Sequence, residues 1–149
     1  MDQRQLPEDF REFLRLLNSH EVRYLLIGGF AVGYHGYPRA TGDMDIWVAT
    51  TPENADKMVR VLKAFGFDVP ELNCELFLKK RQVIRIGVPP IRIEMLTDIS
   101  GVSFDECYEK RVTDFIDGVS VNIISLAHLK VNKKASGRAK DLHDFEYLP

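Results

Sequence analysis

The feature that most constrains the fold is an apolar run, residues 22–28 (VRYLLIG), that leads directly into a pair of glycines, Gly28 and Gly29. A short run rich in branched and aromatic side chains predicts a buried strand. The apolar segment 30–36 that follows predicts a short helix, and residues 43–48 (DMDIWV) predict a second strand. A chain that alternates strands and helices in this way favours an α/β domain.

The remaining segments extend this alternation. Their apolar spacing predicts helices at residues 7–20 and 52–65 and two strands around a turn at residues 82–96. A short helix at residues 104–111, a strand at 119–124 and one or two terminal helices at 125–148 follow. Residues 72–81 fit a strand and a helix equally well. We therefore expect one domain over residues 1–149, of the α/β (α+β) class, with a mixed sheet flanked by helices and a C-terminal helical segment at about 125–149.

The composition suits a globular chain, since 45% of the 149 residues are hydrophobic and the net charge is -2. No apolar run approaches the roughly 20 residues that span a bilayer, and the acidic, polar start differs from a signal peptide. Cys74 and Cys107 are too widely spaced for a metal knuckle. We expect a cytoplasmic protein that does not bind membranes.

Two aspartates, Asp43 and Asp45, interrupt the apolar character of the second predicted strand. Side chains two residues apart on a strand share a face, so the two carboxylates repel unless a cation lies between them. Mg²⁺ is typically held by one or two carboxylates together with substrate phosphates. Glu94, on the alternating segment 91–96 (IRIEML), is the candidate for a third carboxylate. Solvated aspartates at a strand start remain the alternative.

The glycine pair predicts a contact of a different kind. A strand that ends in Gly28 and Gly29 before a helix exposes backbone N–H groups without side chains in the way, which suits phosphate. The spacing matches neither the dinucleotide fingerprint nor the P-loop. A tight turn with close helix packing is the simpler explanation of the glycines alone, so the pair is informative only in combination with the aspartates.

In combination, these features resemble the nucleotidyltransferase superfamily, in which Gly-Gly or Gly-Ser follows the first strand, DxD lies on the second and a further carboxylate lies on a later strand. The run is most similar to the small nucleotidyltransferases of bacterial abortive-infection and toxin–antitoxin systems. Their typical Arg-x-Thr-x-Asp-x-Asp is here Arg39, Thr41, Asp43 and Asp45. Residues 132–148 are similar to that group's C-terminal signature, which is carried by Lys133, Gly137, Arg138, Lys140, Asp141 and Asp144.

The resemblance implies a nucleotidyltransferase fold and an enzyme that moves an NMP from an NTP such as ATP to a hydroxyl acceptor, releasing pyrophosphate. It implies that Asp43, Asp45 and Glu94 are catalytic and hold Mg²⁺ or Mn²⁺. It also implies that nucleotide-binding residues surround them, namely Gly28, Gly29, Arg39, Thr41 and Lys133. RNA such as tRNA, or a protein, is the implied acceptor, and a helical protein is the implied partner.

One departure from the family pattern leaves alternatives open. The later carboxylate is usually Asp in this superfamily, whereas Glu94 is one methylene longer. A catalytically inactive relative that binds nucleotide or a partner, as a toxin–antitoxin component, is therefore a second hypothesis. A metal-dependent nuclease using the same carboxylates is a third. The five basic residues within 130–140 fit a phosphate- or RNA-facing surface and a solvated helix face equally well.

Overall fold

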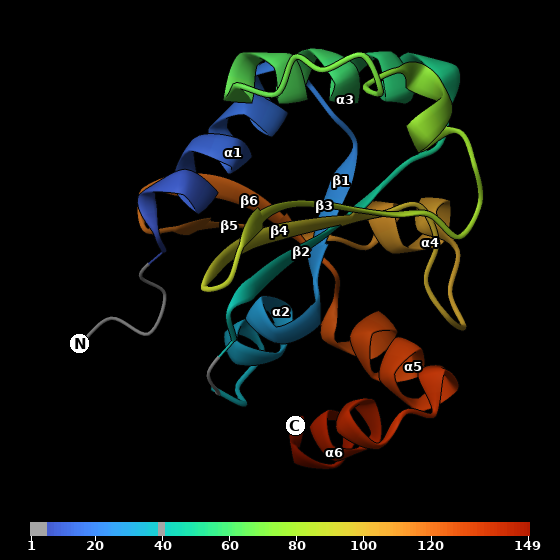
Figure 1. Ribbon diagram of the computed structural model, residues 1–149. Helices are drawn as coiled ribbons and strands as arrows, with labels where there is room; N and C mark the ends of the chain where they lie inside the picture. The colour runs from blue at the N-terminus through green and yellow to red at the C-terminus, as the bar shows by residue number, and fades with distance from the viewer. Residues whose placement is uncertain (1–5, 39–40) are drawn as a thin grey trace.

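The computed structural model describes residues 6–38 and 41–149, which form a mixed six-stranded sheet between two layers of helices (Figure 1). In chain order the elements are α1 (Glu8–Ser19), β1 (Tyr24–Ile27), α2 (Gly28–Tyr34), β2 (Asp43–Val48), α3 (Pro52–Phe65), the 3-10 helix η1 (Cys74–Phe77), β3 (Val83–Val88), β4 (Ile91–Leu96), α4 (Phe104–Glu109), β5 (Val112–Ile116), β6 (Val119–Ile123), α5 (Leu126–Ser136) and α6 (Ala139–Tyr147). The predicted α/β class with a mixed sheet is confirmed.

The strands lie in the order β3-β4-β2-β1-β6-β5. The inner strand β2 pairs with β1 in antiparallel and with β4 in parallel orientation, and β1 pairs with β6 in parallel. Antiparallel hairpins, β3 with β4 and β5 with β6, form the two outer parts of the sheet. The parallel pairing of β2 with β4 matters most for function, because it brings residues 43–47 alongside residues 92–96.

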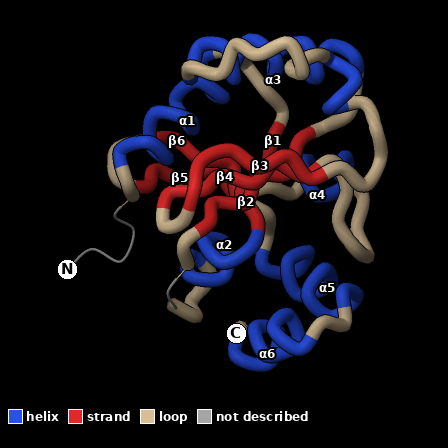
Figure 2. Tube along the Cα trace, viewed as in Figure 1, coloured by secondary structure: helices blue, strands red, loops and turns tan. Residues whose placement is uncertain are grey.

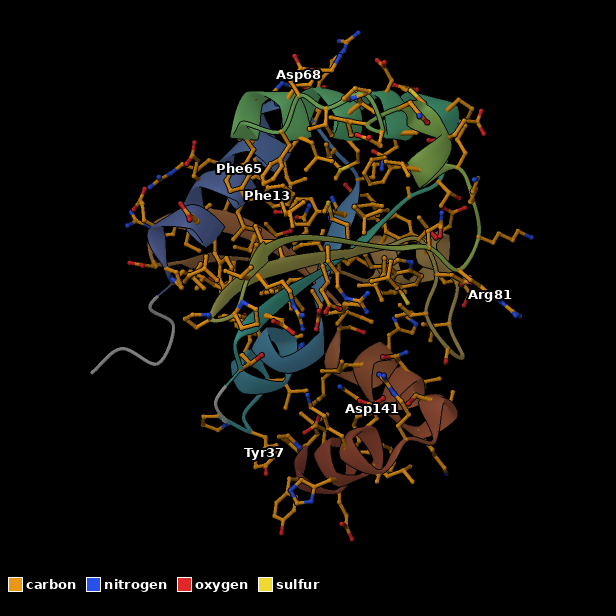
Figure 3. All side chains as sticks on the ribbon, viewed as in Figure 1. Phe13, Tyr37, Phe65, Asp68, Arg81 and Asp141 are labelled. Atoms are coloured by element: carbon orange, nitrogen blue, oxygen red, sulfur yellow. The ribbon has the colours of Figure 1, made fainter. Side chains whose placement is uncertain are left out.

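Helices α1 and α3 cover one face of the sheet, and α2, α5 and α6 lie beyond the other (Figure 2). Four apolar side chains of α1 are buried there, namely Phe10, Phe13, Leu14 and Leu17. Phe13 meets Phe65 of α3 edge to face, with ring centroids 5.2 Å apart (Figure 3). Each fully buried large side chain contributes about 1.5–3 kcal/mol, so this layer anchors the sheet from the side opposite the candidate site.

Local signals explain where α3 begins and ends. Thr51 caps its N-terminus by accepting a hydrogen bond from the Asn54 backbone N–H at 3.2 Å, and Pro52 occupies the first turn. Gly66 ends the helix in the left-handed conformation, with φ of 113°. Both boundaries match the sequence prediction.

Three details differ from the sequence expectations. Helix α2 begins at Gly28 itself, the ambiguous segment 72–81 contains the short 3-10 helix η1, and the strand β5 was not predicted. Within the described ranges, none of the helices is long and apolar enough to cross a membrane.

Candidate active site

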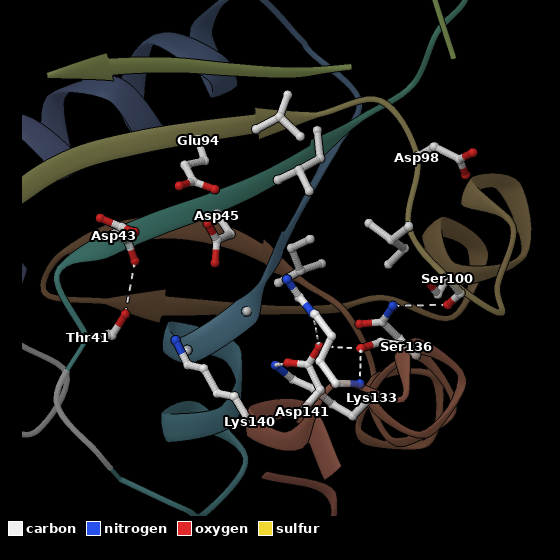
Figure 4. Close-up of a pocket in the computed structure, with 18 of the residues that line it drawn as sticks. Thr41, Asp43, Asp45, Glu94, Asp98, Ser100, Lys133, Ser136, Lys140 and Asp141 are labelled. Carbon is white, nitrogen blue, oxygen red and sulfur yellow. Dashed lines mark hydrogen bonds and ion pairs between the residues drawn. The ribbon is translucent and has the colours of Figure 1, made fainter. Parts of the chain in front are cut away.

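The three predicted carboxylates meet on one face of the sheet. In the parallel register of β2 and β4, Asp45 lies directly opposite Glu94, and Asp43 lies opposite Arg92. Neighbouring strands are about 4.8 Å apart, so the side chains of such pairs are adjacent. Met44 and Ile46 point to the opposite face and are fully buried, as the alternation predicts. Figure 4 shows Asp43, Asp45 and Glu94 extending from the sheet on the side where Lys133 and Lys140 lie.

Two arginines that the sequence reasoning missed neutralise part of this carboxylate group. Arg92 donates to both oxygens of Asp43, through Nε to Oδ1 at 3.1 Å and through Nη2 to Oδ2 at 2.8 Å. Its Nη2 also lies 3.3 Å from Oε1 of Glu94. Arg85, on β3, donates from Nε to the same Oε1 at 3.2 Å. Asp43 and Glu94 are therefore paired, each with at least one guanidinium.

Asp45 is different, because no arginine or lysine forms an ion pair with it within residues 6–38 and 41–149. Burial, followed by the nearby charges of Glu94 and Asp43, raises the pKa of Asp45 from 3.8 to about 7. The more distant Lys133 and Lys140 lower it only in part. Excess negative charge thus concentrates at Asp45, and a cation placed there would relieve it.

Gly28 and Gly29 are held against the second strand and the loop before it. Gly28 has φ of 67°, and a Cβ at this position would overlap the carboxylate of Asp45. A Cβ at Gly29 would lie 2.7 Å from Oγ1 of Thr41, which donates to the Asp43 carbonyl at 3.2 Å. The glycines are thus required by close packing onto the predicted site, which combines the two readings that the sequence left open.

A basic wall faces the carboxylates from α5 and α6. Lys133 is buried and its Nζ lies 3.0 Å from Oδ1 of Asp141 and 3.1 Å from Oδ2 of Asp144. Arg138 donates from Nε to Oδ2 of Asp141 at 2.8 Å, and Ser136 also donates to this carboxylate. Although burial alone would raise the pKa of Asp141, these hydrogen bonds and the Lys133 charge bring it below its ordinary value.

These elements enclose a cavity of about 450 Å³. Its walls include the glycine pair, Thr41, the three carboxylates and Arg85, together with Lys133 of α5, Lys140 of α6 and Arg138 at the start of α6. Cavities of this size hold small ligands, and the combination of carboxylates with cations suits a nucleotide bound through a metal ion. The structure therefore brings seven of the eight predicted site residues to one cavity. The eighth, Arg39, lies outside the described residues.

The three carboxylates supply the kind of donor atom that a divalent cation requires. Carboxylate oxygens are the ligands that Mg²⁺ and Mn²⁺ prefer, and strand register places Asp43, Asp45 and Glu94 side by side. In the part of the chain that the structure describes, however, no three acidic, histidine or cysteine side chains converge closely enough to hold an ion. Arg92 contacts two of the three carboxylates, Asp43 and Glu94. The residues fit a metal in donor type and in strand register, although among the described residues their side chains do not converge on one point.

Comparisons with known proteins agree with this geometry. The structure resembles a proposed nucleotidyltransferase from Thermotoga maritima, with a TM-score of 0.59 and 18% identity over 92% of this chain and 88% of that one. It also resembles an antigenic nucleotidyltransferase-like protein from Paracoccidioides brasiliensis, with a TM-score of 0.54 and 18% identity over 92% of this chain and 72% of that one. At this identity the likeness shows the shared fold. A search of curated proteins gave no match.

A family model shows to which nucleotidyltransferase family the chain belongs. The model for aminoglycoside-2''-adenylyltransferase matches residues 9–148, which include every described residue of the candidate site. The narrower likeness to the toxin–antitoxin group rests on the sequence motifs alone. Because the match spans almost the whole chain, the protein belongs to the aminoglycoside-2''-adenylyltransferase family and is a nucleotidyltransferase-superfamily enzyme.

Proposed function

We propose that the protein transfers an NMP from an NTP such as ATP to a hydroxyl group in a reaction that requires Mg²⁺ or Mn²⁺. The observation that supports this most is the parallel register of β2 and β4, which sets Asp45 opposite Glu94 and next to Asp43 at the wall of a cavity. Like charges this close favour a bound cation. A divalent ion held by these carboxylates would neutralise the triphosphate and stabilise charge at the reacting phosphorus.

The residues around the carboxylates take complementary roles. Gly28 and Gly29 line the cavity and are proposed to offer backbone N–H groups to phosphate oxygens, while Thr41 beside them donates a hydrogen bond to the Asp43 carbonyl. Lys133 contributes positive charge from a buried position. Lys140 is an exposed residue of the cavity wall, and we propose that its ammonium group contacts phosphate. Arg39 is proposed to bind phosphate on sequence grounds. Preorganised cations of this kind stabilise a phosphoryl transition state.

The proposed chemical step uses these positions. The acceptor oxygen forms a bond to the α-phosphorus while the bond from that phosphorus to the bridging oxygen breaks, and pyrophosphate leaves. The proton of the acceptor hydroxyl passes to a carboxylate, for which Glu94 is placed beside Asp45 at the cavity wall. RNA such as tRNA and protein hydroxyls remain the proposed acceptors. The name of the matched family adds an aminoglycoside hydroxyl as a third class.

An acceptor screen tests this proposal. The protein would be incubated with each α-labelled NTP and Mg²⁺ or Mn²⁺, separately with total RNA, lysate protein and aminoglycosides. We expect label transfer to one acceptor class, with pyrophosphate released. Asp43→Ala and Asp45→Ala should each reduce transfer by at least about a hundredfold, because each removes charge stabilisation at the reacting centre. Transfer that persists in both variants would contradict the assigned mechanism.

A second function is favoured by one observation, the pairing of Asp43 and Glu94 with Arg92 and Arg85. If these pairs persist when nucleotide binds, the protein is a nucleotide- or partner-binding relative that acts as a toxin–antitoxin component. Calorimetry would then show NTP binding without pyrophosphate release across the same screen. Co-purification of a helical protein would identify the partner. Any pyrophosphate release that depends on Asp43 would contradict this second function and support the nucleotidyltransferase.

A further inference from the structure

Arg92 occupies a central position among the carboxylates although it does not line the cavity. It precedes Glu94 by two residues on β4, so both side chains lie on the same face of the sheet. The parallel register sets Arg92 directly opposite Asp43. The described cavity wall includes Asp43 and Glu94 but not Arg92, which therefore contacts them from the side.

The contacts of Arg92 use the oxygen atoms that a metal ion requires. Its planar guanidinium donates to Oδ1 and Oδ2 of Asp43 at 3.1 and 2.8 Å, and its Nη2 lies 3.3 Å from Oε1 of Glu94. Bidentate pairs of this kind are among the stronger polar contacts and orient the carboxylate. Asp43 is accordingly held towards Arg92, and it does not converge with Asp45 and Glu94 on a common point.

A divalent cation and the Arg92 guanidinium cannot both be held closely by Asp43 and Glu94. Two positive groups a few ångströms apart repel strongly, and this repulsion is weakly screened in a partly buried site. The Arg92 side chain is 31% exposed, so its long stem has room to turn away. Arg85 is a weaker competitor, because it contacts Glu94 alone and is 56% exposed.

We propose that Arg92 is a built-in counter-cation of the catalytic carboxylates, which a divalent ion must displace from Asp43 and Glu94 in order to bind. Arg92 is thus a positioning residue that sets the affinity of the site for metal. The inference rests on the proposed function, since it takes the three carboxylates to be the metal ligands. In the metal-free protein Arg92 keeps Asp43 neutralised, and metal alone binds weakly.

Metal binding measured without nucleotide tests the inference directly. Free Mn²⁺ would be followed by electron paramagnetic resonance during titration of the full chain and its variants. Arg92→Met keeps an unbranched, flexible stem but removes the guanidinium and its charge, and we expect it to bind Mn²⁺ at least about tenfold more tightly. Arg92→Lys keeps the charge but loses the two-pronged contact, and its affinity should lie between those of wild type and Arg92→Met.

A matched control separates local competition from net charge. Arg60 on α3 pairs with Asp56 at 3.0 Å, on an element that covers the opposite face of the sheet. Arg60→Met makes the same change in net charge, and its Mn²⁺ affinity should equal that of wild type. Circular dichroism and thermal melting would establish that each variant is folded. Should Arg92→Met fail to fold, the comparison of Arg92→Lys with wild type decides.

The possible outcomes distinguish the inference from the proposed function. Tighter Mn²⁺ binding by the Arg92 variants, with Arg60→Met unchanged, supports both. Equal or weaker binding by the Arg92 variants, while wild type binds Mn²⁺, overturns the inference and leaves the metal site intact. An absence of Mn²⁺ binding in wild type and every variant removes the metal site itself, and with it both proposals.

Discussion

Gly28 shows how strongly a single residue constrains this site. Its φ of 67° is strained for any residue with a side chain, and a Cβ there would overlap the carboxylate of Asp45. Gly33 lies in the same helix, α2, but a Cβ at that position would meet no atom within 4 Å. Packing against Asp45 therefore requires glycine at position 28, whereas none of the described residues around position 33 excludes a side chain.

We expect Gly28→Ala to lower nucleotide transfer by at least about a hundredfold, because a displacement of about 1 Å at a reacting group can cost that much. The left-handed backbone should also destabilise the fold by about 1–2 kcal/mol. Initial rates with labelled NTP and urea unfolding would measure the two effects.

Gly33→Ala is the matched control. It should retain transfer and stabilise the helix by about 0.5–1 kcal/mol, because alanine has the higher helix propensity. Equal activity of Gly28→Ala and Gly33→Ala would show that the packing of Gly28 on Asp45 is unimportant for function.

Residue patterns predicted much of the site, but not its counter-charges. The DxD spacing places Asp43 and Asp45 on one face without knowledge of the fold, because strand side chains alternate. Arg92 precedes Glu94 by two residues, so its shared face with Glu94 was also readable. Its position opposite Asp43 was not, since the register between β2 and β4 depends on the packing of segments far apart in the chain.

At the scale of elements, α6 is fastened to α5 by buried charges. Lys133 on α5 forms ion pairs with Asp141 and Asp144 on α6, at 3.0 and 3.1 Å. Buried charges left without partners are costly, so the pairs fix how the two helices meet. Because Arg138 and Lys140 of the cavity wall closely precede Asp141 in sequence, this packing also positions the basic side of the site.

Asp141→Asn should therefore destabilise the protein by about 1.5–3 kcal/mol at pH 7, the usual range for hydrogen bonds to charged groups. The pKa of Asp141 is lowered in the folded state, so its stabilisation is complete above pH 3.8 and is lost as pH falls through the folded pKa. The difference between wild type and variant should accordingly shrink below about pH 4. Urea unfolding across this range measures it.

Asp68→Asn provides the comparison, because Asp68 is exposed in the loop after α3 (Figure 3). Its unfolding free energy should stay within about 0.5 kcal/mol of wild type. If Asp141→Asn behaved like Asp68→Asn at pH 7, the charge cluster would not hold α6 in place.

The strand β5 illustrates what element prediction missed and why. Val112–Ile116 and Val119–Ile123 form a hairpin through Asp117 and Gly118, both with positive φ. An Asp-Gly pair between alternating segments is a strong local hairpin signal, so β5 was predictable from the sequence. The contact of α6 with α5 was not, because it depends on a lysine that becomes buried only when the two helices meet.

At the scale of the whole molecule, the site lowers the stability of the fold. Asp45 is buried near Glu94 and Asp43, and its pKa rises from 3.8 to about 7. As pH rises between these values, the unfolded chain loses the Asp45 proton while the folded protein retains it. Stability therefore falls across this window, which is typical of sites that concentrate like charge for function.

Asp45→Asn removes this penalty. In metal-free buffer with EDTA, the variant should gain unfolding free energy relative to wild type as pH rises from 4 to 8, by about 1.4 kcal/mol at most for each pH unit inside the window. Urea unfolding at several pH values measures the difference, and Asp68→Asn should follow wild type throughout. Adding Mn²⁺ at pH 8 should then stabilise wild type but not Asp45→Asn, because ligands stabilise only a state that binds them. A constant difference between Asp45→Asn and wild type at all pH values would mean that Asp45 is not crowded by its neighbours.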